Sequence, residues 1–287
     1  MQIRGMYFSG TGTTEKIVTT IAKALQDNLG DPFAKAPDID FTLPQARQKE
    51  YAFTDDDIVV FGVPVIAGRV PNVLLKFLDT LQGGGAMAVP VVLYGNRDFD
   101  DALIELRNIL EDKGFHTIAA AAFIGEHSFS RVLAAGRPDA NDMAEADFFS
   151  RAVADKIHML IGSAGGSKEL LQKLLDVQGP IPVDGQEPLR GYYQPRDRQG
   201  THINILKVKP KLDSAKCTGC GLCVDICPMG SIKKEAPGVV EGICIKCCGC
   251  EKKCPEGALY FDDPGYLYHK EELELGYAER KEPKLFI

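Results

Sequence analysis

The sequence predicts an α/β domain with a doubly wound parallel sheet, followed by a smaller α+β domain that is built around cysteines. Three observations lead to this prediction. Over the first 161 residues, short apolar runs with β-strand character alternate with amphipathic helical segments. A loop rich in glycine and hydroxyl residues, at 9–14, separates the first apolar run from the first helical segment. All nine cysteines lie between Cys217 and Cys254.

The elements of the first domain follow from the spacing of apolar residues. The opening run at 2–8 reads as a strand, and Ile17, Ile21 and Leu25 then follow at the spacing of one helix face. Further strands are predicted at 57–65, 88–96 and 116–125, and helices at 71–82, 98–114 and 142–161. The segment FTLPQA near residue 41 is a candidate for the remaining strand. This alternation is typical of a parallel sheet with helices on both faces.

The composition is that of a soluble globular protein, and its 287 residues suit about two domains. The net charge of −7 and the pI of about 5.4 argue against nucleic acid or an anionic membrane as a partner. The sequence shows neither a signal peptide nor a membrane span. Disulfide scaffolds usually occur in short secreted chains, so the cysteines read as reduced thiolates that hold metal. We therefore predict a cytoplasmic protein from a reducing, anaerobic setting.

Two cysteine runs share the spacing C-x-x-C-x-x-C-x-x-x-C-P. The first run begins at Cys217 and the second at Cys244, so each cysteine of the first run recurs 27 residues later. Three thiolates at three-residue spacing can surround one corner of an iron–sulfur cluster, whereas the fourth lies too far along the chain to close the same site easily. Zinc is the alternative, but zinc sites usually place C-x-x-C pairs on either side of a longer loop. The triple spacing favours two [4Fe–4S] clusters.

This region resembles the bacterial-type ferredoxins that carry two [4Fe–4S] clusters, over residues 206–265. The resemblance implies a crossed arrangement of ligands, because the fourth cysteine of each run serves the other cluster. One cluster would be held by Cys217, Cys220, Cys223 and Cys254. The other would be held by Cys244, Cys247, Cys250 and Cys227. The ninth cysteine, Cys248, breaks the spacing and reads as a small buried residue, with a redox-active thiol as the alternative.

The loop after the first strand has the composition of a phosphate-binding turn. Ligands of a doubly wound sheet bind outside the carboxyl ends of its strands, where this loop lies. Its members are Ser9, Gly10, Thr11, Gly12, Thr13 and Thr14. Glycines let backbone amides converge, hydroxyls donate to phosphate oxygens, and the helix N-terminus adds positive potential. Glu15 stands where a dinucleotide fingerprint needs glycine, and the missing Walker lysine counts against ATP, so the loop favours a terminal phosphate, with an ordinary helix cap as the alternative.

The first domain, residues 1–162, resembles the flavodoxin family, whose FMN phosphate loop has the form Ser/Thr-x-Thr-Gly-x-Thr. The matching positions are Ser9, Thr11, Gly12 and Thr14. The resemblance implies FMN as cofactor, with its ring held by the loops at 65–71 and 94–102. The implied ring contacts in these loops are Val65, Ile66, Ala67, Gly68, Arg69, Tyr94, Gly95, Asn96, Arg97 and Phe99. Because the chain has no tryptophan, Tyr94 and Phe99 are the candidates to stack on the flavin.

Positive charge at the implied ring site sets a further expectation. Arg69 and Arg97 lie in the two ring loops, and a third loop at 125–131 adds His127 and Arg131. Cations beside the ring would favour the anionic reduced flavin and raise its potential. Solvated surface charges are the alternative for the arginines, and a structural hydrogen bond is the alternative for His127.

The remaining segments complete the predicted organisation. Residues 163–205 hold a helix-like stretch and then a stretch rich in glycine and proline, which indicates a linker with a docking segment. A lead-in strand is predicted at 203–213, where the domain at 206–265 begins. The polar tail, 266–287, reads either as a strap across the domain or as a partly mobile end.

As a whole, the chain resembles the fused flavodoxin–ferredoxin proteins of anaerobic bacteria and archaea. The resemblance implies a carrier that passes electrons between two [4Fe–4S] clusters and FMN, with a redox protein such as a reductase or an oxidoreductase subunit as partner. One alternative is a flavin-dependent reductase of a small-molecule acceptor, fed by its own clusters. Another is an assembly protein that holds its cofactors structurally. The carrier is favoured because neither an acid–base pair nor a nicotinamide fingerprint can be identified, while the donor, the acceptor and homo-oligomer formation stay open.

Overall fold

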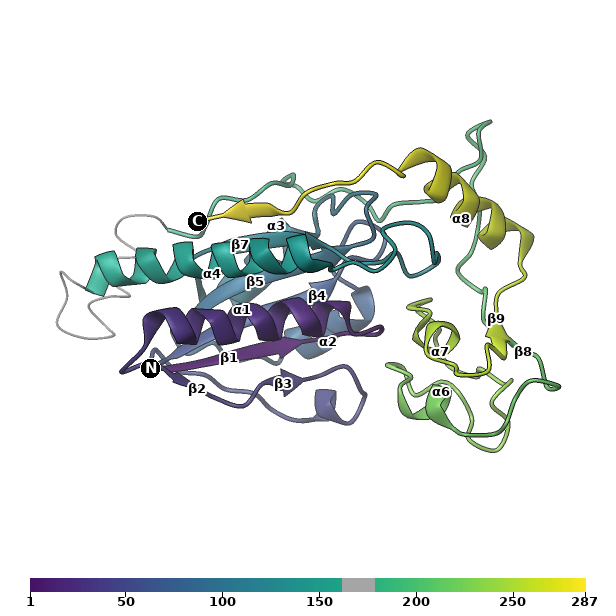
Figure 1. Cartoon of the computed structure of the whole chain (residues 1–287), viewed down its shortest axis with the longest axis horizontal. Helices are drawn as coiled ribbons and strands as arrows, with labels where there is room; N and C mark the ends of the chain where they lie inside the picture. Colours follow the sequence, from purple (N-terminus) through teal and green to yellow (C-terminus); the bar gives the residue numbers. More distant parts are fainter. Residues whose placement is uncertain (162–178) are drawn as a thin grey trace.

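The computed structural model describes residues 1–161 and 179–287 of the chain. In its first half strands alternate with helices, as the apolar spacing predicts (Figure 1). The strands there are β1 (Gln2–Tyr7), β2 (Ala34–Lys35), β3 (Ile39–Asp40), β4 (Asp57–Pro64), β5 (Met87–Tyr94), β6 (His116–Thr117) and β7 (Ala120–Ile124). The helices are α1 (Thr13–Leu29), α2 (Leu75–Leu78), α3 (Ala102–Asp112) and α4 (Ala140–Ile161), with 3-10 turns at Ala46–Gln48 and Asn72–Leu74.

The strand order defines the fold of this half. The sheet runs β7-β5-β4-β1-β2 with all these neighbours parallel, while β3 adds to β1 and β6 to β5. This is the 2-1-3-4-5 order of flavodoxin-like doubly wound sheets, in which the order reverses between the first and third strands. The N-terminal half is therefore a flavodoxin-like α/β domain, as predicted. Its switch point lies between β1 and β4, at their carboxyl ends.

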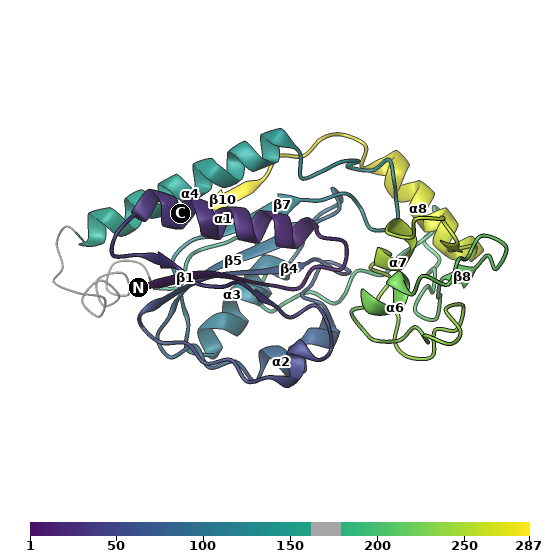
Figure 2. The ribbon, with the colours of Figure 1, turned by 60° about the horizontal axis from the view of Figure 1, so that its bottom comes forward.

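Two apolar layers hold the sheet between its helices. Side chains of β4 alternate between them, with Ile58 and Val60 in one layer and Val59 and Phe61 in the other. The first layer packs under α1 and α4, and the second contains residues of α2 and α3. Figure 2 shows these two pairs of helices on opposite sides of the sheet. Because β4 is buried on both faces, its sequence is a nearly continuous apolar run rather than an alternating one.

Three predicted elements of this domain differ in the structure. The strand predicted near residue 41 is wrong, because β2 and β3 pair with β1 and the FTLPQA segment follows them as a loop containing Pro44. The helix predicted at 71–82 is reduced to a 3-10 turn followed by the short α2. The strand predicted at 116–125 is divided into β6 and β7, which pair with different parts of β5.

The second half is smaller and has little regular structure. Its elements are β8 (Lys211–Leu212), α6 (Leu222–Asp225), α7 (Gly249–Lys252), β9 (Leu259–Tyr260), α8 (Pro264–Gly276) and β10 (Lys284–Phe286). The predicted lead-in strand at 203–213 is thus only the two residues of β8, which pair antiparallel with β9. Helices α6 and α7 lie 27 residues apart, so the repeat in the sequence is also a repeat in the structure. In the parts of the chain that the structure describes, no helix is both long and apolar enough to span a membrane.

The C-terminal segment returns to the first domain as a strap. Asp263 caps α8 by accepting a hydrogen bond from the backbone N–H of Tyr266 at 2.9 Å, and Pro264 occupies the first turn. After α8 the chain runs back along the sheet, where β10 pairs antiparallel with β7 (Figure 1). The predicted strap is therefore present, and its last strand is an edge strand of the flavodoxin-like sheet.

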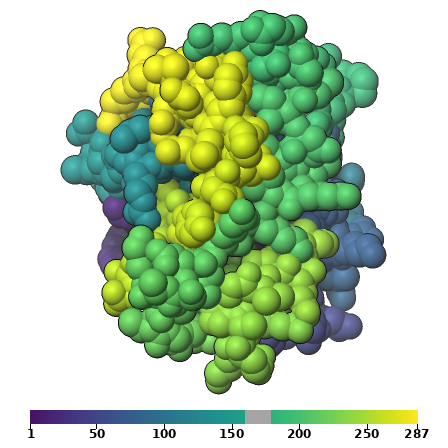
Figure 3. All heavy atoms as spheres, turned by 90° about the vertical axis from the view of Figure 1, so that its right-hand side faces the viewer, coloured from purple at the N-terminus to yellow at the C-terminus, as the bar shows by residue number. Residues whose placement is uncertain are grey.

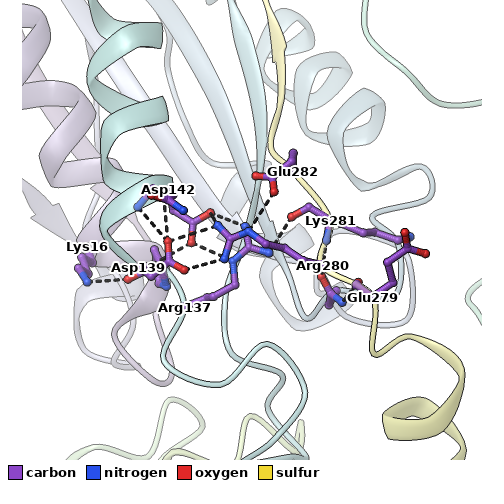
Figure 4. Close-up of polar contacts among 11 residues, drawn as sticks. Lys16, Arg137, Asp139, Asp142, Glu279, Arg280, Lys281 and Glu282 are labelled. Atoms are coloured by element: carbon purple, nitrogen blue, oxygen red, sulfur yellow. Dashed lines mark hydrogen bonds and ion pairs between the residues drawn. The ribbon is translucent and has the colours of Figure 1, made fainter.

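Charged side chains fix the strap beside α4 (Figure 4). Arg137 pairs with Asp142, both almost completely buried, and donates to the carbonyl oxygen of Lys281 in the strap at 2.7 Å. Arg280 of the strap donates to the carboxylate of Asp139 at 2.7 Å. This guanidinium holds the pKa of Asp139 well below its usual range. The strap is thereby tied to the loop that precedes α4.

Candidate functional site

The loop between β1 and α1 has the backbone of a tight strand-to-helix turn. Gly12 has φ = 101°, a left-handed conformation that glycine adopts without the steric cost of a side chain. The hydroxyl oxygen of Ser9 accepts hydrogen bonds from the backbone N–H groups of Gly12 and Glu15, both at 3.1 Å. Ser9 therefore stabilises the turn and the start of α1, and its oxygen is already engaged there.

A large cavity opens beside this turn, at the switch point of the sheet. It has a volume of about 890 Å³, and its walls include the loops that follow β1, β4, β5 and β7. The second half of the chain closes the other side, with Tyr192–Pro195, His202–Leu206, Ile243–Cys247, His269 and Leu273. A crevice outside the carboxyl ends of the strands is where doubly wound sheets bind their ligands. Figure 3 looks onto this end of the molecule, which residues of the second half cover.

The structure brings most of the predicted flavin contacts together around this cavity. Those that line it are Gly10, Thr11, Thr13, Thr14, Val65, Ile66, Ala67, Gly68, Tyr94, Gly95, Arg97 and His127. The structure places five others outside its walls, namely Ser9, Gly12, Arg69, Asn96 and Phe99. The ring of Phe99 is buried against that of Tyr94, with centroids 5.5 Å apart. The side-chain amide of Asn96 donates to the carbonyl oxygens of Tyr277 and Glu279 in the strap.

The predicted arginines serve mainly other partners. Both nitrogens on one edge of the Arg69 guanidinium donate to the carboxylate of Glu105 at 2.7 Å. That bidentate contact is the main reason that the pKa of Arg69 is raised. Arg97 pairs with Asp100, and Arg131 donates to the carbonyl oxygen of Glu251 at 3.3 Å. Each of these three arginines thus has an acceptor within the protein, and Arg97 is the one of the three that lines the cavity.

Two adjacent tyrosines of the linker complete the cavity wall. The guanidinium of Arg69 lies over the ring of Tyr192 at 5.0 Å, and that of Arg97 over the ring of Tyr193 at 4.2 Å. Tyr193 also stacks on His269 of α8, with ring centroids 5.9 Å apart. The sequence predicted a docking segment here, but it did not identify these two tyrosines as part of the site. The pattern that could have identified them is a pair of aromatic residues within a stretch rich in glycine, proline and charged residues.

A buried carboxylate anchors the same linker segment. Asp101 at the start of α3 is completely buried, and it accepts hydrogen bonds from the backbone N–H groups of Gln186 and Arg190. It also accepts from the side chain of Arg190, whose charge and hydrogen bonds lower the pKa of Asp101 despite its burial. The segment that carries the two tyrosines is thus fixed to the first domain before it reaches the cavity.

Two histidines in the cavity wall are neutral at pH 7. Burial, together with nearby positive groups of which Lys252 is the first, lowers the pKa of His127 to about 3. Its Nδ1 accepts a hydrogen bond from the backbone N–H of Phe129 at 3.1 Å, so the ring proton lies on Nε2. Burial and the charge of Arg97 likewise lower the pKa of His269 to about 4. His127 is therefore a neutral hydrogen-bond donor beside the cavity.

The cysteines of the two runs are grouped across the repeat. Cys217, Cys220, Cys223 and Cys254 line one small cavity, which thus combines three cysteines of the first run with the last of the second. Burial, together with the nearby thiols of Cys244 and Cys227, raises the pKa of Cys247 to about 11. After burial, the thiols of Cys247 and Cys244 and then those of Cys227 and Cys223 also raise the pKa of Cys250. The four cysteines of the small cavity are those that the ferredoxin resemblance implies for one cluster, while the crossed arrangement as a whole stays a prediction.

Backbone geometry around the cysteines suits cluster ligation. The backbone N–H of Ser231 points to the sulfur of Cys227 at 3.4 Å, and that of Ala258 to the sulfur of Cys254 at 3.3 Å. Such N–H···S contacts stabilise thiolate sulfurs and tune cluster potentials. Within residues 1–161 and 179–287, no group of three or more His, Cys, Asp or Glu side chains is arranged around a single metal ion. The four-cysteine cavity and the two N–H···S contacts fit an iron–sulfur cluster, which is larger than a single metal ion and holds its cysteine ligands farther apart.

Cys248 occupies a special backbone position in the repeat. It precedes α7 with φ = 57°, and its counterpart before α6 is Gly221 with φ = 79°. The side chain is only 2% exposed, and its sulfur lies 3.4 Å from the hydroxyl of Tyr266. Cys248 belongs to a small apolar cluster with Ile205 and Phe261, which agrees with the reading of a small buried residue.

Replacing Cys248 is expected to leave the predicted clusters in place. Cys248→Ala should retain about eight iron atoms per chain, because the two runs supply eight other cysteines. Cys248→Gly serves as the matched variant, since glycine removes the left-handed strain of about 1 kcal/mol while losing the same buried sulfur. The measurement is iron and acid-labile sulfide per chain, with denaturant unfolding for stability. Loss of about half the iron in Cys248→Ala would show that this residue is a ligand.

The two halves meet at the phosphate loop and the second cysteine run. A Cβ atom on Gly10 would lie 2.8 Å from the Cβ of Cys247 and 3.2 Å from its sulfur. A Cβ atom on Gly249 would lie 2.5 Å from the carbonyl oxygen of Gly10. Both glycines are therefore required by the close approach of the two backbones. Lys252 of α7 adds a polar contact, because its ammonium donates to the carboxylate of Glu126 at 2.5 Å.

Comparison with known protein families agrees with the cysteine spacing of the first run, which begins at Cys217. The family model of the 4Fe-4S binding domain matches residues 210–233. Solved structures similar to the first half include a flavodoxin from the domain Archaea, with 16% identity, TM-score 0.39, and coverage of 54% of this chain and 98% of that chain. A Streptococcus pneumoniae TIGR4 flavodoxin shows 16% identity, TM-score 0.35, and coverage of 54% and 99%. The apo form of an NADH:FMN oxidoreductase, EMOB, shows 18% identity, TM-score 0.38, and coverage of 53% and 88%. None of the curated proteins matches the chain.

Proposed function

We propose that this chain is an electron-transfer protein that passes electrons between two [4Fe–4S] clusters and FMN. The observation that carries the proposal is the contact between the predicted phosphate loop and the second cysteine run. Gly10 and Cys247 approach so closely that Gly10 cannot accommodate a side chain without movement of Cys247, and both residues line the same cavity. A flavin in that cavity would lie next to a cluster held by the second run.

The chain supplies binding, orientation and exclusion of water. Clusters exchange single electrons and flavin exchanges one or two, so a protein that holds both can collect single electrons and release a pair. Thr11 and Thr13 line the cavity, where their hydroxyls would donate to a phosphate and the start of α1 would add its partial positive charge. Tyr192 and Tyr193 cover the cavity from the linker side. His127, which lines the cavity, would offer its Nε2–H to a polar edge of a bound flavin.

FMN is the flavin that suits this loop. The exposed Glu15 follows directly after Thr14, in the first turn of α1, so a second phosphate group extending along the helix would meet a carboxylate. The proposed partner is a one-electron redox protein, such as a reductase or an oxidoreductase subunit, in the cytoplasm of an anaerobe. The chain as a whole then fits the fused flavodoxin–ferredoxin type, with or without self-association.

A flavin-dependent reductase of a small acceptor is the second candidate. The observation that favours it is the size of the cavity, about 890 Å³, which is near the upper end of small-ligand sites. Part of its wall, at His202–Leu206, comes from neither the predicted flavin loops nor the cysteine runs. A small acceptor could be held there beside the flavin.

Anaerobic purification tests the first proposal. We expect one flavin, identified as FMN by chromatography, together with about eight iron and eight sulfide per chain. A redox titration should show clusters and flavin titrating in the same preparation. FAD in the denatured extract would contradict the assignment of FMN, and half the iron would contradict two clusters. Fast turnover of quinones or nitro compounds by the reduced chain alone would favour the reductase instead.

A further inference from the structure

The two sets of cysteines differ in their position relative to the flavin cavity. We call Cys244, Cys247, Cys250 and Cys227 the proximal cluster site, and Cys217, Cys220, Cys223 and Cys254 the distal cluster site. Cys244 and Cys247 line the flavin cavity, whereas the distal cysteines line a separate small cavity in the second half. Cys247 is also the cysteine that touches Gly10 of the phosphate loop.

The fourth ligand of the proximal site is held against the first domain as well. Pro228 follows Cys227, and its carbonyl oxygen accepts a hydrogen bond from the guanidinium of Arg47 at 2.6 Å. Burial lowers the pKa of Arg47. Its guanidinium also donates a hydrogen bond to the carbonyl oxygen of Phe41 at 3.0 Å, which fixes the side chain further. Both chain segments that bring ligands to the proximal site therefore contact the flavodoxin-like domain, one through Cys247 and the other through Pro228. This fixes the proximal site at the interface by two independent contacts.

The distal site faces solvent. Cys220 is exposed, and Leu222 beside it is 36% exposed. Gly219 and Gly221 on either side of Cys220 meet no atoms within 4 Å of an added Cβ, so this turn lies in open space. In the second run the equivalent turn, around Cys247, is packed on Gly10. The same local structure is thus covered in one copy of the repeat and accessible in the other.

We propose that the two cluster sites act in series, with the proximal site exchanging electrons with the flavin and the distal site exchanging them with an external one-electron redox protein. This inference rests on the proposed function. In the reductive direction, the external protein loses one electron to the distal cluster, which passes it to the proximal cluster and then to the flavin. Two such transfers, with two protons from water, reduce the flavin fully and return both clusters to their oxidised state. The oxidative direction reverses each step.

Matched cysteine variants of the loaded full-length chain test the order. Cys223→Ser damages the distal site and Cys250→Ser the proximal site, and the two positions are equivalent in the repeat. A photochemically generated deazaflavin radical supplies single electrons, and flavin reduction is followed by absorbance. Cys223→Ser should transfer electrons from its remaining cluster at a rate independent of protein concentration. In Cys250→Ser the step should depend on protein concentration and be about a hundredfold slower at micromolar protein, because the intramolecular route is lost.

A second measurement does not depend on the variants. A crystal structure of the loaded native chain, grown anaerobically, should place the flavin nearer to the cluster bound by Cys247 than to the cluster bound by Cys220. A flavin nearer to the distal cluster overturns the series order, as does fast concentration-independent transfer in Cys250→Ser. If the native chain itself shows no transfer between clusters and flavin, the proposed function fails instead.

Discussion

Thr11→Glu is expected to give a chain that keeps its iron and loses its flavin. Thr11 lines the cavity and is half-buried, so a longer side chain can be accommodated while its carboxylate faces the flavin phosphate. Two unit charges 4 Å apart repel each other by about 4 kcal/mol at an effective dielectric of 20, which weakens binding roughly a thousandfold. Flavin and iron per chain are measured after gel filtration.

Thr11→Gln is the matched control for this change. Glutamine has nearly the same size and shape but no charge, so it should retain most of the flavin. Retention of flavin in Thr11→Glu at the native level would place the phosphate elsewhere. Loss of flavin from both variants would indicate that the hydroxyl or the shape of the loop, rather than charge, decides binding.

Lys252→Met is expected to loosen the contact between the two halves. Its side chain is 11% exposed, and the ammonium donates to Glu126 and to the carbonyl oxygens of His127 and Ser130 at 2.7 Å. Removing it leaves three acceptors without this donor, and we expect a loss of about 2 kcal/mol, which is less than for a fully buried pair. Transfer between cluster and flavin should slow, because α7 carries both Lys252 and Cys250, a ligand of the proximal site.

The neighbouring Lys253→Met is the control, since Lys253 is exposed and carries the same charge. Hydrogen exchange in residues 125–131 should increase in Lys252→Met and remain unchanged in Lys253→Met. The rate of flavin reduction after a photochemical pulse provides the second measurement. Equal behaviour of the two variants would show that the lysine contact does not hold the halves together.

Local sequence patterns predicted those parts of the site whose residues all belong to one short segment of the chain. The strand–loop–helix around Thr11 and the two cysteine runs depend on spacing over a few residues, and the structure shows them at the predicted positions. The doubly wound order likewise follows from alternating apolar periods, which record burial on both faces of the sheet. The loop and the cysteine runs could be predicted because one short segment contains all the residues that define each of them.

Contacts between distant segments were not predictable in this way. Arg69 and Arg190 are 121 residues apart, yet the side chain of Arg69 donates to the backbone carbonyl of Arg190. Its partner Glu105 and the ring of Tyr192 also belong to other segments. Without these partners, an arginine in a flavin loop looks like a free cation. For the same reason, Asn96 was predicted to contact the flavin, whereas its amide is occupied by the strap.

The pairing of β10 with β7 also has a consequence for biosynthesis. In topological terms the cluster-binding segment is an insertion within the sheet domain, because a strand of that sheet comes after it in the chain. At about 5–20 residues per second, the ribosome needs roughly 10–30 s to proceed from the end of β7 to β10. During that time the outer edge of β7 has unpaired N–H and C=O groups, the kind of edge that recruits strands from other chains. Cluster insertion into the intervening segment can proceed in the same interval, before the last strand closes the sheet.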